Sequence, residues 1–132
     1  ILTVHYEACM NNMNEVIDGI KKNGMKAGIA INPDTDINVL EKFIKDIDLV
    51  IVMGVFPGFS GQSFIEETYQ RCFEVKELVM RYNSSALIEI DGGVTVHNAR
   101  KLLDNGADVL VSGSHVFKSN NPTEIIQKLK DI

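Results

Sequence analysis

Three glycine-rich segments stand where this chain could hold a phosphate group. They read Pro57-Gly58-Phe59-Ser60-Gly61-Gln62-Ser63-Phe64, Asp91-Gly92-Gly93 and Ser112-Gly113-Ser114, and each follows an apolar run. Glycine lets backbone N–H groups come close to phosphate oxygens, and a helix that begins after such a loop adds a favourable dipole. One such loop alone is more often a plain turn between a strand and a helix. Three in succession predict a phosphate-binding site.

Asp91 is the acidic residue that the pattern singles out for chemistry. It ends the run Glu89-Ile90-Asp91 and precedes two glycines, so we expect its carboxylate to project into the mouth of the site. The alternative is that it caps the next helix, but Thr95 is nearer to that helix and better placed. We interpret Asp91 as a metal ligand, a proton-transfer base, or both.

The histidines and cysteines are weaker signals. His5 ends the first apolar run and should point toward the same mouth, although a core or rim histidine explains it equally well. His97 and His115 are expected to face solvent, and no two histidines are one helical turn apart, as metal ligands often are. Cys9 and Cys72 are far apart in the sequence and predict reduced thiols in helix-packing positions.

Five short apolar runs must position these residues. Because the runs alternate with amphipathic segments, they predict repeated βα units, and because they are continuously apolar they favour parallel strands covered on both faces. Ligands gather at the carboxyl ends of such strands, where the three glycine-rich loops lie. The predicted strands are residues 1–4, 26–31, 49–53, 86–90 and 109–112.

The segments between the runs carry apolar stripes at helical spacing. Asn23-Gly24 and Asn105-Gly106 are expected to end two of these helices, and Asn121-Pro122 to begin the last one. The stripes are Met10, Met13, Val16, Ile17 and Ile20; Leu40, Phe43 and Ile44; Tyr69, Cys72, Phe73, Leu78, Val79 and Tyr82; Val96, Ala99, Leu102 and Leu103; and Ile125, Ile126 and Leu129.

Length narrows the choice of architecture. The 132 residues should form one α/β unit, either an open doubly wound sheet or part of a closed barrel. A complete eight-stranded barrel needs at least about 200 residues, so a barrel would be partial. Its phosphate site follows strands seven and eight, which makes these runs strands four to eight. The chain begins at Ile1 within an apolar run, and we expect residues 1–132 to be the C-terminal part of a single barrel domain that lacks its N-terminal strands.

Charge and hydropathy indicate which kinds of partner the protein binds. The net charge of −5, with Lys and Arg scattered along the helices, argues against a nucleic-acid surface. No apolar run approaches the roughly 20 residues of a membrane-spanning helix, and no targeting leader precedes the first run. We therefore expect a cytoplasmic protein that has no membrane or nucleic-acid partner and binds a small anionic substrate.

Six short segments together resemble one enzyme family. In chain order they are Thr3-Val4-His5-Tyr6-Glu7-Ala8, Asn32-Pro33, Val52-Met53, residues 57–64, Glu89-Ile90-Asp91-Gly92-Gly93 and Gly106-Ala107-Asp108-Val109. They resemble the C-terminal three-fifths of the ribulose-phosphate 3-epimerase family, with allulose-6-phosphate 3-epimerase as a close relative. The resemblance implies a (β/α)₈ barrel that inverts C3 of a ketose phosphate through a metal-stabilised enediolate, with two aspartates on opposite faces of the sugar.

The resemblance also implies roles for individual residues. Asp91 matches the aspartate that both binds the divalent metal (Zn, Fe, Mn or Co) and serves as one acid/base. Met53 matches a methionine that lines the pocket, where plain core packing explains it nearly as well. The family's other aspartate and its remaining metal ligands, two histidines among them, come from earlier strands. The phosphate-binding loops match Gly58, Phe59, Ser60, Gly61, Gly92, Gly93, Gly113 and Ser114.

Two departures leave the substrate open. Gly54 stands where the family commonly has Ser or Thr, and Phe56 where it often has Asn, Asp or Glu. We expect a ribulose-phosphate 3-epimerase that forms a homo-oligomer and is inactive as the isolated chain. The alternatives are an allulose-6-phosphate 3-epimerase, a noncatalytic phosphosugar-binding half-barrel, and another phosphate-binding barrel such as hexulose-phosphate synthase or thiamine-phosphate synthase.

Overall fold

Five parallel strands form one curved sheet in the computed structural model, which describes residues 1–59 and 61–132. The strands are β1 (Leu2–His5), β2 (Ala27–Ile31), β3 (Leu49–Met53), β4 (Leu87–Asp91) and β5 (Val109–Val111), and they pair in chain order. Each runs within two residues of its predicted bounds. Because every neighbouring pair of strands is parallel, all five carboxyl ends lie along one edge of the sheet.

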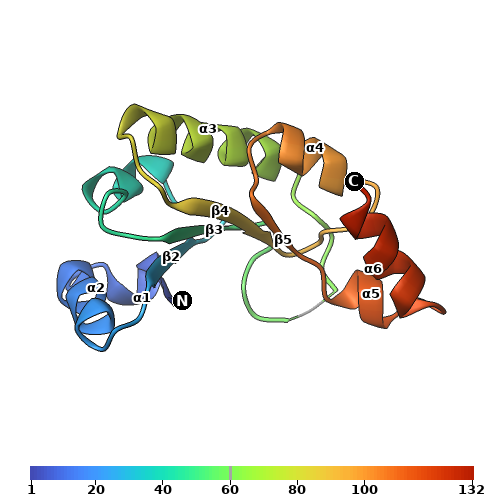
Figure 1. Ribbon diagram of the computed structural model, residues 1–132, viewed down its shortest axis with the longest axis horizontal. Coiled ribbons are helices and arrows are strands. Elements are labelled where there is room, and N and C mark those ends of the chain that lie inside the picture. The colour runs from blue at the N-terminus through green and yellow to red at the C-terminus, as the bar shows by residue number, and fades with distance from the viewer. Residues whose placement is uncertain (60) are drawn as a thin grey trace.

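Helices connect the strands and cover the sheet from outside. In Figure 1, α3 and α4 run along one side of the sheet, with α2 near its first strands and α5 and α6 beyond its last. The helices are α1 (Tyr6–Cys9), α2 (Met13–Lys22), the 3-10 helix η1 (Ile37–Lys42), α3 (Thr68–Arg81), α4 (Ala99–Asp104), α5 (Ser114–Phe117) and α6 (Pro122–Lys130). No helix among the described residues is long and apolar enough to cross a membrane.

The core lies between the sheet and these helices. Alternate strand residues such as Ile29, Val52 and Ile90 are fully buried against it, together with Ile17 of α2 and Cys72 of α3. Such burial is worth roughly 1.5–3 kcal/mol for each large apolar side chain. The two cysteines are both unpaired, Cys72 buried and Cys9 partly so, as expected.

The opposite face of the sheet is covered only in part. All five residues of β2 are buried, but Leu87 of β4 and Val111 of β5 are 44% and 38% exposed on this face. The expectation that the strands would be covered on both faces is therefore wrong for β4 and β5. The reason is that the helices pack on one face alone, so burial in β4 alternates instead of being continuous.

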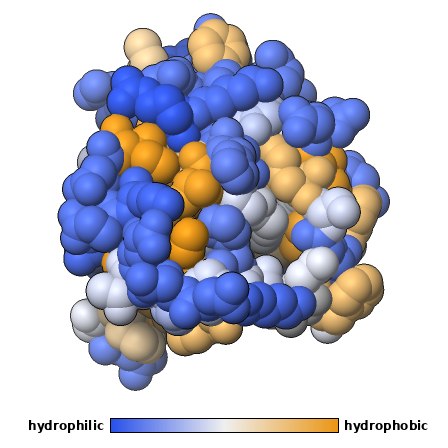
Figure 2. All heavy atoms as spheres, turned by 90° about the vertical axis from the view of Figure 1, so that its right-hand side faces the viewer, coloured by the Kyte–Doolittle hydropathy of each residue, from blue (hydrophilic) through white to orange (hydrophobic). Residues whose placement is uncertain are grey.

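Two helical predictions need correction. Of the stripe of Leu40, Phe43 and Ile44, only Leu40 lies in a helix, the 3-10 helix η1, and Phe43 and Ile44 follow its end. Asp36 begins η1 by accepting the N–H of Asn38. The final helix begins at Asn121 as predicted, because the side chain of that residue accepts the N–H of Glu124. None of its residues is fully buried: Ile125 and Leu129 are partly buried and Ile126 is exposed, so its apolar stripe packs only in part. Figure 2 views the molecule from the α5 and α6 side and shows apolar residues surrounded by hydrophilic ones.

Candidate active site

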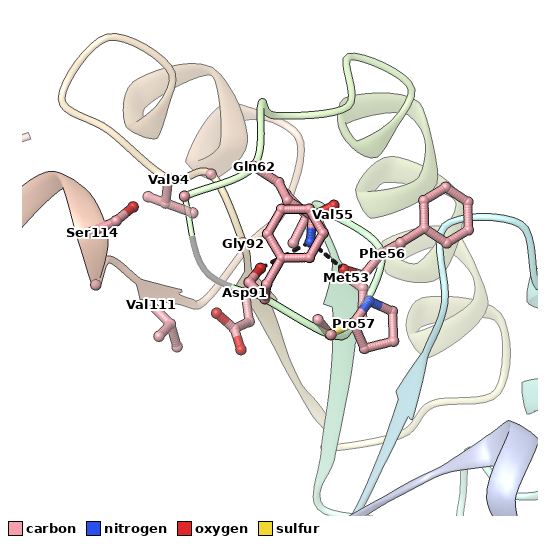
Figure 3. A pocket seen from close by; sticks show the side chains of 15 residues that line it. Met53, Val55, Phe56, Pro57, Gln62, Asp91, Gly92, Val94, Val111 and Ser114 are labelled. Carbon is pink, nitrogen blue, oxygen red and sulfur yellow. Dashed lines mark hydrogen bonds between the residues drawn. The ribbon is translucent and has the colours of Figure 1, made fainter.

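A cavity of about 380 Å³ opens at the carboxyl edge of β3, β4 and β5. The loops that follow these three strands supply its walls, and Figure 3 shows Asp91 between Val111 and the segment Met53–Pro57. Strand register explains this arrangement, since Met53, Asp91 and Val111 are paired across neighbouring strands and so share one row on one face of the sheet. The lining residues are Met53, Val55, Phe56, Pro57, Gly58, Phe59, Gly61, Gln62, Asp91, Gly92, Gly93, Val94, Val111, Gly113 and Ser114.

Asp91 ends β4 and lines the cavity, where the sequence led us to expect it. Its carboxylate takes no part in starting the next helix. Thr95 does so instead, by accepting the N–H of His97 with its hydroxyl and the N–H of Ala99 with its carbonyl oxygen. The carboxylate of Asp91 is therefore available to a ligand in the cavity. Its roles as acid/base and metal ligand stay predictions.

The glycine-rich loops meet around the same cavity. Gly58, Phe59 and Gly61 come from the first loop, Gly92 and Gly93 from the second, and Gly113 and Ser114 from the third. Ser60, which the resemblance also assigns to phosphate binding, lies outside the described residues. The structure thus brings together every described residue of the predicted cradle, and phosphate binding itself stays a prediction.

Gln62 holds the first loop in shape, a role that the sequence analysis did not assign. Its side-chain amide donates to the carbonyl oxygens of Phe56 (2.6 Å) and Phe59 (2.9 Å), as the dashed lines in Figure 3 mark. These two bonds close the loop over six residues and present Gly58 and Phe59 to the cavity. A glutamine within a glycine-rich loop was the available signal for this clamp.

The first two loops also pack backbone against backbone. The N–H of Gly54 donates to the carbonyl oxygen of Asp91 at 2.7 Å, and a β-carbon on Gly54 would overlap the carbonyl oxygen of Gly92. Glycine at position 54 therefore permits the close approach that a serine or threonine would prevent. This steric role accounts for one of the two departures from the family pattern. The other, Phe56, lines the cavity and is half-exposed.

The two other predicted pocket residues are placed differently. Met53 is nearly buried and lines the cavity. His5 is not among the lining residues, because it ends β1, two strands away from β3. Its Nδ1 lies 3.3 Å from Oε2 of Glu7. His97 is exposed as expected, whereas His115 is partly buried and its Nε2 accepts the N–H of Val96 at 3.4 Å, so the expectation that it faces solvent is wrong.

A polar network beyond the cavity ties three elements together. Glu7 accepts the N–H of Asn32 at 2.9 Å and the hydroxyl of Thr35, while the Arg71 guanidinium donates to the carbonyl oxygens of Asn32 (3.0 Å) and Thr35 (2.8 Å). Burial alone would raise the pKa of Glu7, but these hydrogen bonds and the one to His5 together lower it. The network fixes the loop after β2 between α1 and α3.

We expect Glu7→Gln to destabilise the protein at pH 7, because a neutral amide accepts these hydrogen bonds less strongly than a carboxylate. A carboxyl group whose pKa is lowered on folding stabilises the fold above its unfolded pKa of about 4.3 and loses that contribution as pH falls through its folded pKa. The two proteins should thus differ in urea midpoint at pH 7 and converge near pH 3. A difference that persists unchanged at pH 3 would contradict the assigned role.

Glu89 is a second perturbed carboxyl group on the cavity side of β4. It lies two residues before Asp91, so both side chains leave the strand on the same face. Burial, and then the charge of Asp91, raises the pKa of Glu89. The two neighbouring carboxyl groups make this face of β4 a favourable place for a cation or a proton.

The described residues alone do not complete a metal centre. Asp91 offers one hard oxygen ligand of the kind that divalent metals take, but no group of three His, Cys, Asp or Glu side chains that could hold a metal ion is found within residues 1–59 and 61–132.

Solved structures share this arrangement of strands and helices. The chain aligns with 3-hexulose-6-phosphate synthase of Salmonella typhimurium with a TM-score of 0.67 at 14% identity, covering 98% of this chain and 59% of that one. It aligns with KGPDC of Streptococcus mutans with a TM-score of 0.63 at 17% identity, covering 98% and 57%. Both are TIM-barrel enzymes, so the predicted α/β fold, a partial (β/α)₈ barrel, is confirmed.

Sequence comparison identifies the family. The sequence model of the ribulose-phosphate 3 epimerase family matches residues 1–117. Ribulose-phosphate 3-epimerase of Helicobacter pylori is 39% identical over 132 residues, covering 100% of this chain and 60% of the relative. Ribulose-phosphate 3-epimerase of Bacillus subtilis is 39% identical over 131 residues, covering 98% and 60%. The chain spans about three-fifths of the length of these curated relatives. With its match over residues 1–117, the chain belongs to the ribulose-phosphate 3-epimerase family.

Proposed function

We propose that this chain forms the C-terminal part of a ribulose-phosphate 3-epimerase, which interconverts D-ribulose 5-phosphate and D-xylulose 5-phosphate. The observation that carries the proposal is that one cavity is lined by Asp91 and by residues of all three glycine-rich loops, including every described residue of the predicted phosphate cradle. A phosphate held by the loops would anchor one end of the sugar, while the carboxylate faces the carbon to be inverted. Fixing a substrate at a distance from the reacting atom is an effective way to orient it.

The chemistry would consist of a proton moved at C3. The carboxylate of Asp91 removes the proton from one face of C3 next to the carbonyl, or returns it there in the reverse direction. Inversion requires a second acid/base on the opposite face of the carbon. We propose that this group comes from the remaining strands of the same (β/α)₈ barrel domain, of which residues 1–132 are the C-terminal part.

A divalent metal, such as Zn, Fe, Mn or Co, is part of this proposal. It would stabilise the negative charge that develops on the substrate oxygens when C3 is deprotonated. Asp91 is the described cavity residue suited to hold it, and the other ligands would come from outside the chain. Glu89 would remain close enough to affect the charge of the site.

A hexulose phosphate is a second candidate substrate. Phe56 stands in the cavity lining where the family often has a polar residue, and Gly54 adds no hydroxyl near it. A site with fewer polar groups near the sugar discriminates less strongly between hydroxyl patterns. We propose the pentulose phosphate as the preferred substrate and allulose 6-phosphate as the competitor to test against it.

We further propose that the complete protein works in the cytoplasm on a free phosphorylated ketose and forms a homo-oligomer. Support for association comes from the apolar residues seen on the α5 and α6 face in Figure 2. Phe117 there is 83% exposed, which is unusual for a large aromatic side chain.

The test uses the full natural protein that contains this chain. We expect it to interconvert ribulose 5-phosphate and xylulose 5-phosphate with a higher kcat/KM than it shows for allulose 6-phosphate, and to lose activity on thorough chelation. Restoration by each of the four metals in turn would identify the one used. Phosphosugar binding without any epimerisation would instead support a noncatalytic half-barrel and refute the proposal.

A further inference from the structure

A second cavity of about 460 Å³ adjoins the first on the side of α5. The two share five lining residues, namely Gly61, Gln62, Gly93, Val94 and Ser114, so they form two sides of one loop cluster. The second cavity adds five polar lining residues, namely Ser63, Thr95, Asn98, His115 and Lys118. The loops expected to hold phosphate are therefore backed by a basic side chain.

Lys118 lies directly against the first of these loops. Its Nζ is 2.9 Å from the point that a β-carbon on Gly61 would occupy, so the ammonium group takes the space that the glycine leaves open. Gly61 has a φ of +82°, a conformation that favours glycine and turns this side of the loop toward Lys118. The ammonium group thus reaches the boundary between the two cavities.

The charge of Lys118 is not neutralised by a neighbouring side chain. Among the ion pairs formed by residues 1–59 and 61–132, none includes Lys118. Across the described lining of both cavities, it is the one Lys or Arg, and Asp91 is the one carboxylate. The carboxylate ends β4, whereas the ammonium abuts Gly61 of the first loop. The positive charge therefore lies beside the loops expected to bind the phosphate, and the carboxylate lies where the reacting carbon of the sugar would be.

We propose that Lys118 pairs with the phosphate dianion of the substrate and is a specificity-determining residue of this site. The inference rests on the proposed function and extends it. Backbone N–H groups can position a phosphate, but they carry only partial charges, and a full positive charge adds a stronger hydrogen bond. Because Lys118 contacts the phosphate and not C3, it stabilises the ground state and the transition state equally. Its removal should raise KM and leave kcat unchanged.

The experiment compares three variants of the full natural protein. Lys118→Met keeps the length of the side chain and removes the charge, Lys118→Arg keeps the charge, and Lys26→Met removes a lysine next to β2 at the opposite edge of the sheet. KM and kcat are measured with ribulose 5-phosphate, and the inhibition constant is measured for inorganic phosphate. A second series uses ribulose, the same ketose without its phosphate.

Lys118→Met should raise both the KM for ribulose 5-phosphate and the inhibition constant of phosphate about tenfold, the effect of one charged hydrogen bond. In Lys118→Arg both constants should stay within about threefold of the wild-type values. In Lys26→Met both should equal the wild-type values. Turnover of free ribulose should be equal in the wild type and the three variants. An unchanged KM and inhibition constant in Lys118→Met, with an active wild type, would overturn the inference. A different result would separate the two proposals. If the wild type had no epimerase activity but Lys118→Met still bound phosphate less tightly than the wild type, the epimerase proposal would be refuted and Lys118 would remain an anion-binding residue.

Discussion

Asp91→Asn is expected to lower kcat of the full natural protein by about a thousandfold, because loss of a positioned acid/base typically costs 10²–10⁴-fold. An amide has nearly the shape of the carboxylate but does not accept a proton at neutral pH. Exchange of the C3 hydrogen with solvent deuterium should fall by the same factor for the epimer whose C3 hydrogen faces Asp91. Since the glycine-rich loops are unchanged, the inhibition constant of inorganic phosphate should stay close to that of the wild type.

Asp104→Asn is the matched control for Asp91→Asn. Asp104 lies at the end of α4, exposed, and pairs with Arg100 one helical turn away at 3.1 Å. An exposed pair of this kind contributes little to stability. The control should therefore be fully active. If Asp91→Asn kept more than a tenth of the wild-type kcat, Asp91 would not be one of the two acid/bases.

Gly93→Ala is expected to damage both the stability and the substrate affinity of the protein. Gly93 has a φ of +69°, and a β-carbon there would lie 2.8 Å from both the α-carbon and the β-carbon of Phe64. Neither atom is the mobile end of a side chain, so the loops must move apart. Strained backbone and overpacking each cost about 1–3 kcal/mol, so we expect unfolding free energy to fall by about 2 kcal/mol and KM for ribulose 5-phosphate to rise severalfold. Urea unfolding and steady-state kinetics would measure the two effects.

Gly19→Ala provides the comparison, because no atom lies within 4 Å of a β-carbon placed at position 19 of α2. That change should be neutral or stabilise the helix by up to about 1 kcal/mol, with kinetics unaffected. If Gly93→Ala had the same unfolding free energy as the wild type, Gly93 and Phe64 would not be in the close contact described.

The strands and the cavity residues were predictable because their signals are local. An apolar run rich in β-branched residues defines each strand, and a residue just after it must lie at the carboxyl edge of the sheet. Asp91 and the described residues of the predicted phosphate cradle were found in this way, and the structure brings them together around one cavity. Their chemical roles stay predictions.

The structural features that the sequence did not predict depend on contacts between distant residues. Arg71 and Thr35 are 36 residues apart, and neither lies in a pattern that announces the other. Lys118 reaches Gly61 across 57 positions. The close contact between Gly54 and the carbonyl oxygen of Gly92 likewise follows from the register of β3 and β4. Exposure of one face of β4 depends on what packs over it, which the composition of the strand alone does not determine.

The close approach of Gly54 to Gly92 has a consequence for the evolution of substrate choice. Because the backbones of Gly54 and Gly92 are in contact, a larger residue at position 54 must be accompanied by a shift at position 92. Phe56 and Val111 border the same cavity and are 47% and 38% exposed, so a side chain of another size has room at either position. Natural drift, or a mutant library selected for a different sugar, should therefore accept new residues at 56 and 111 one at a time and at 54 only in combination.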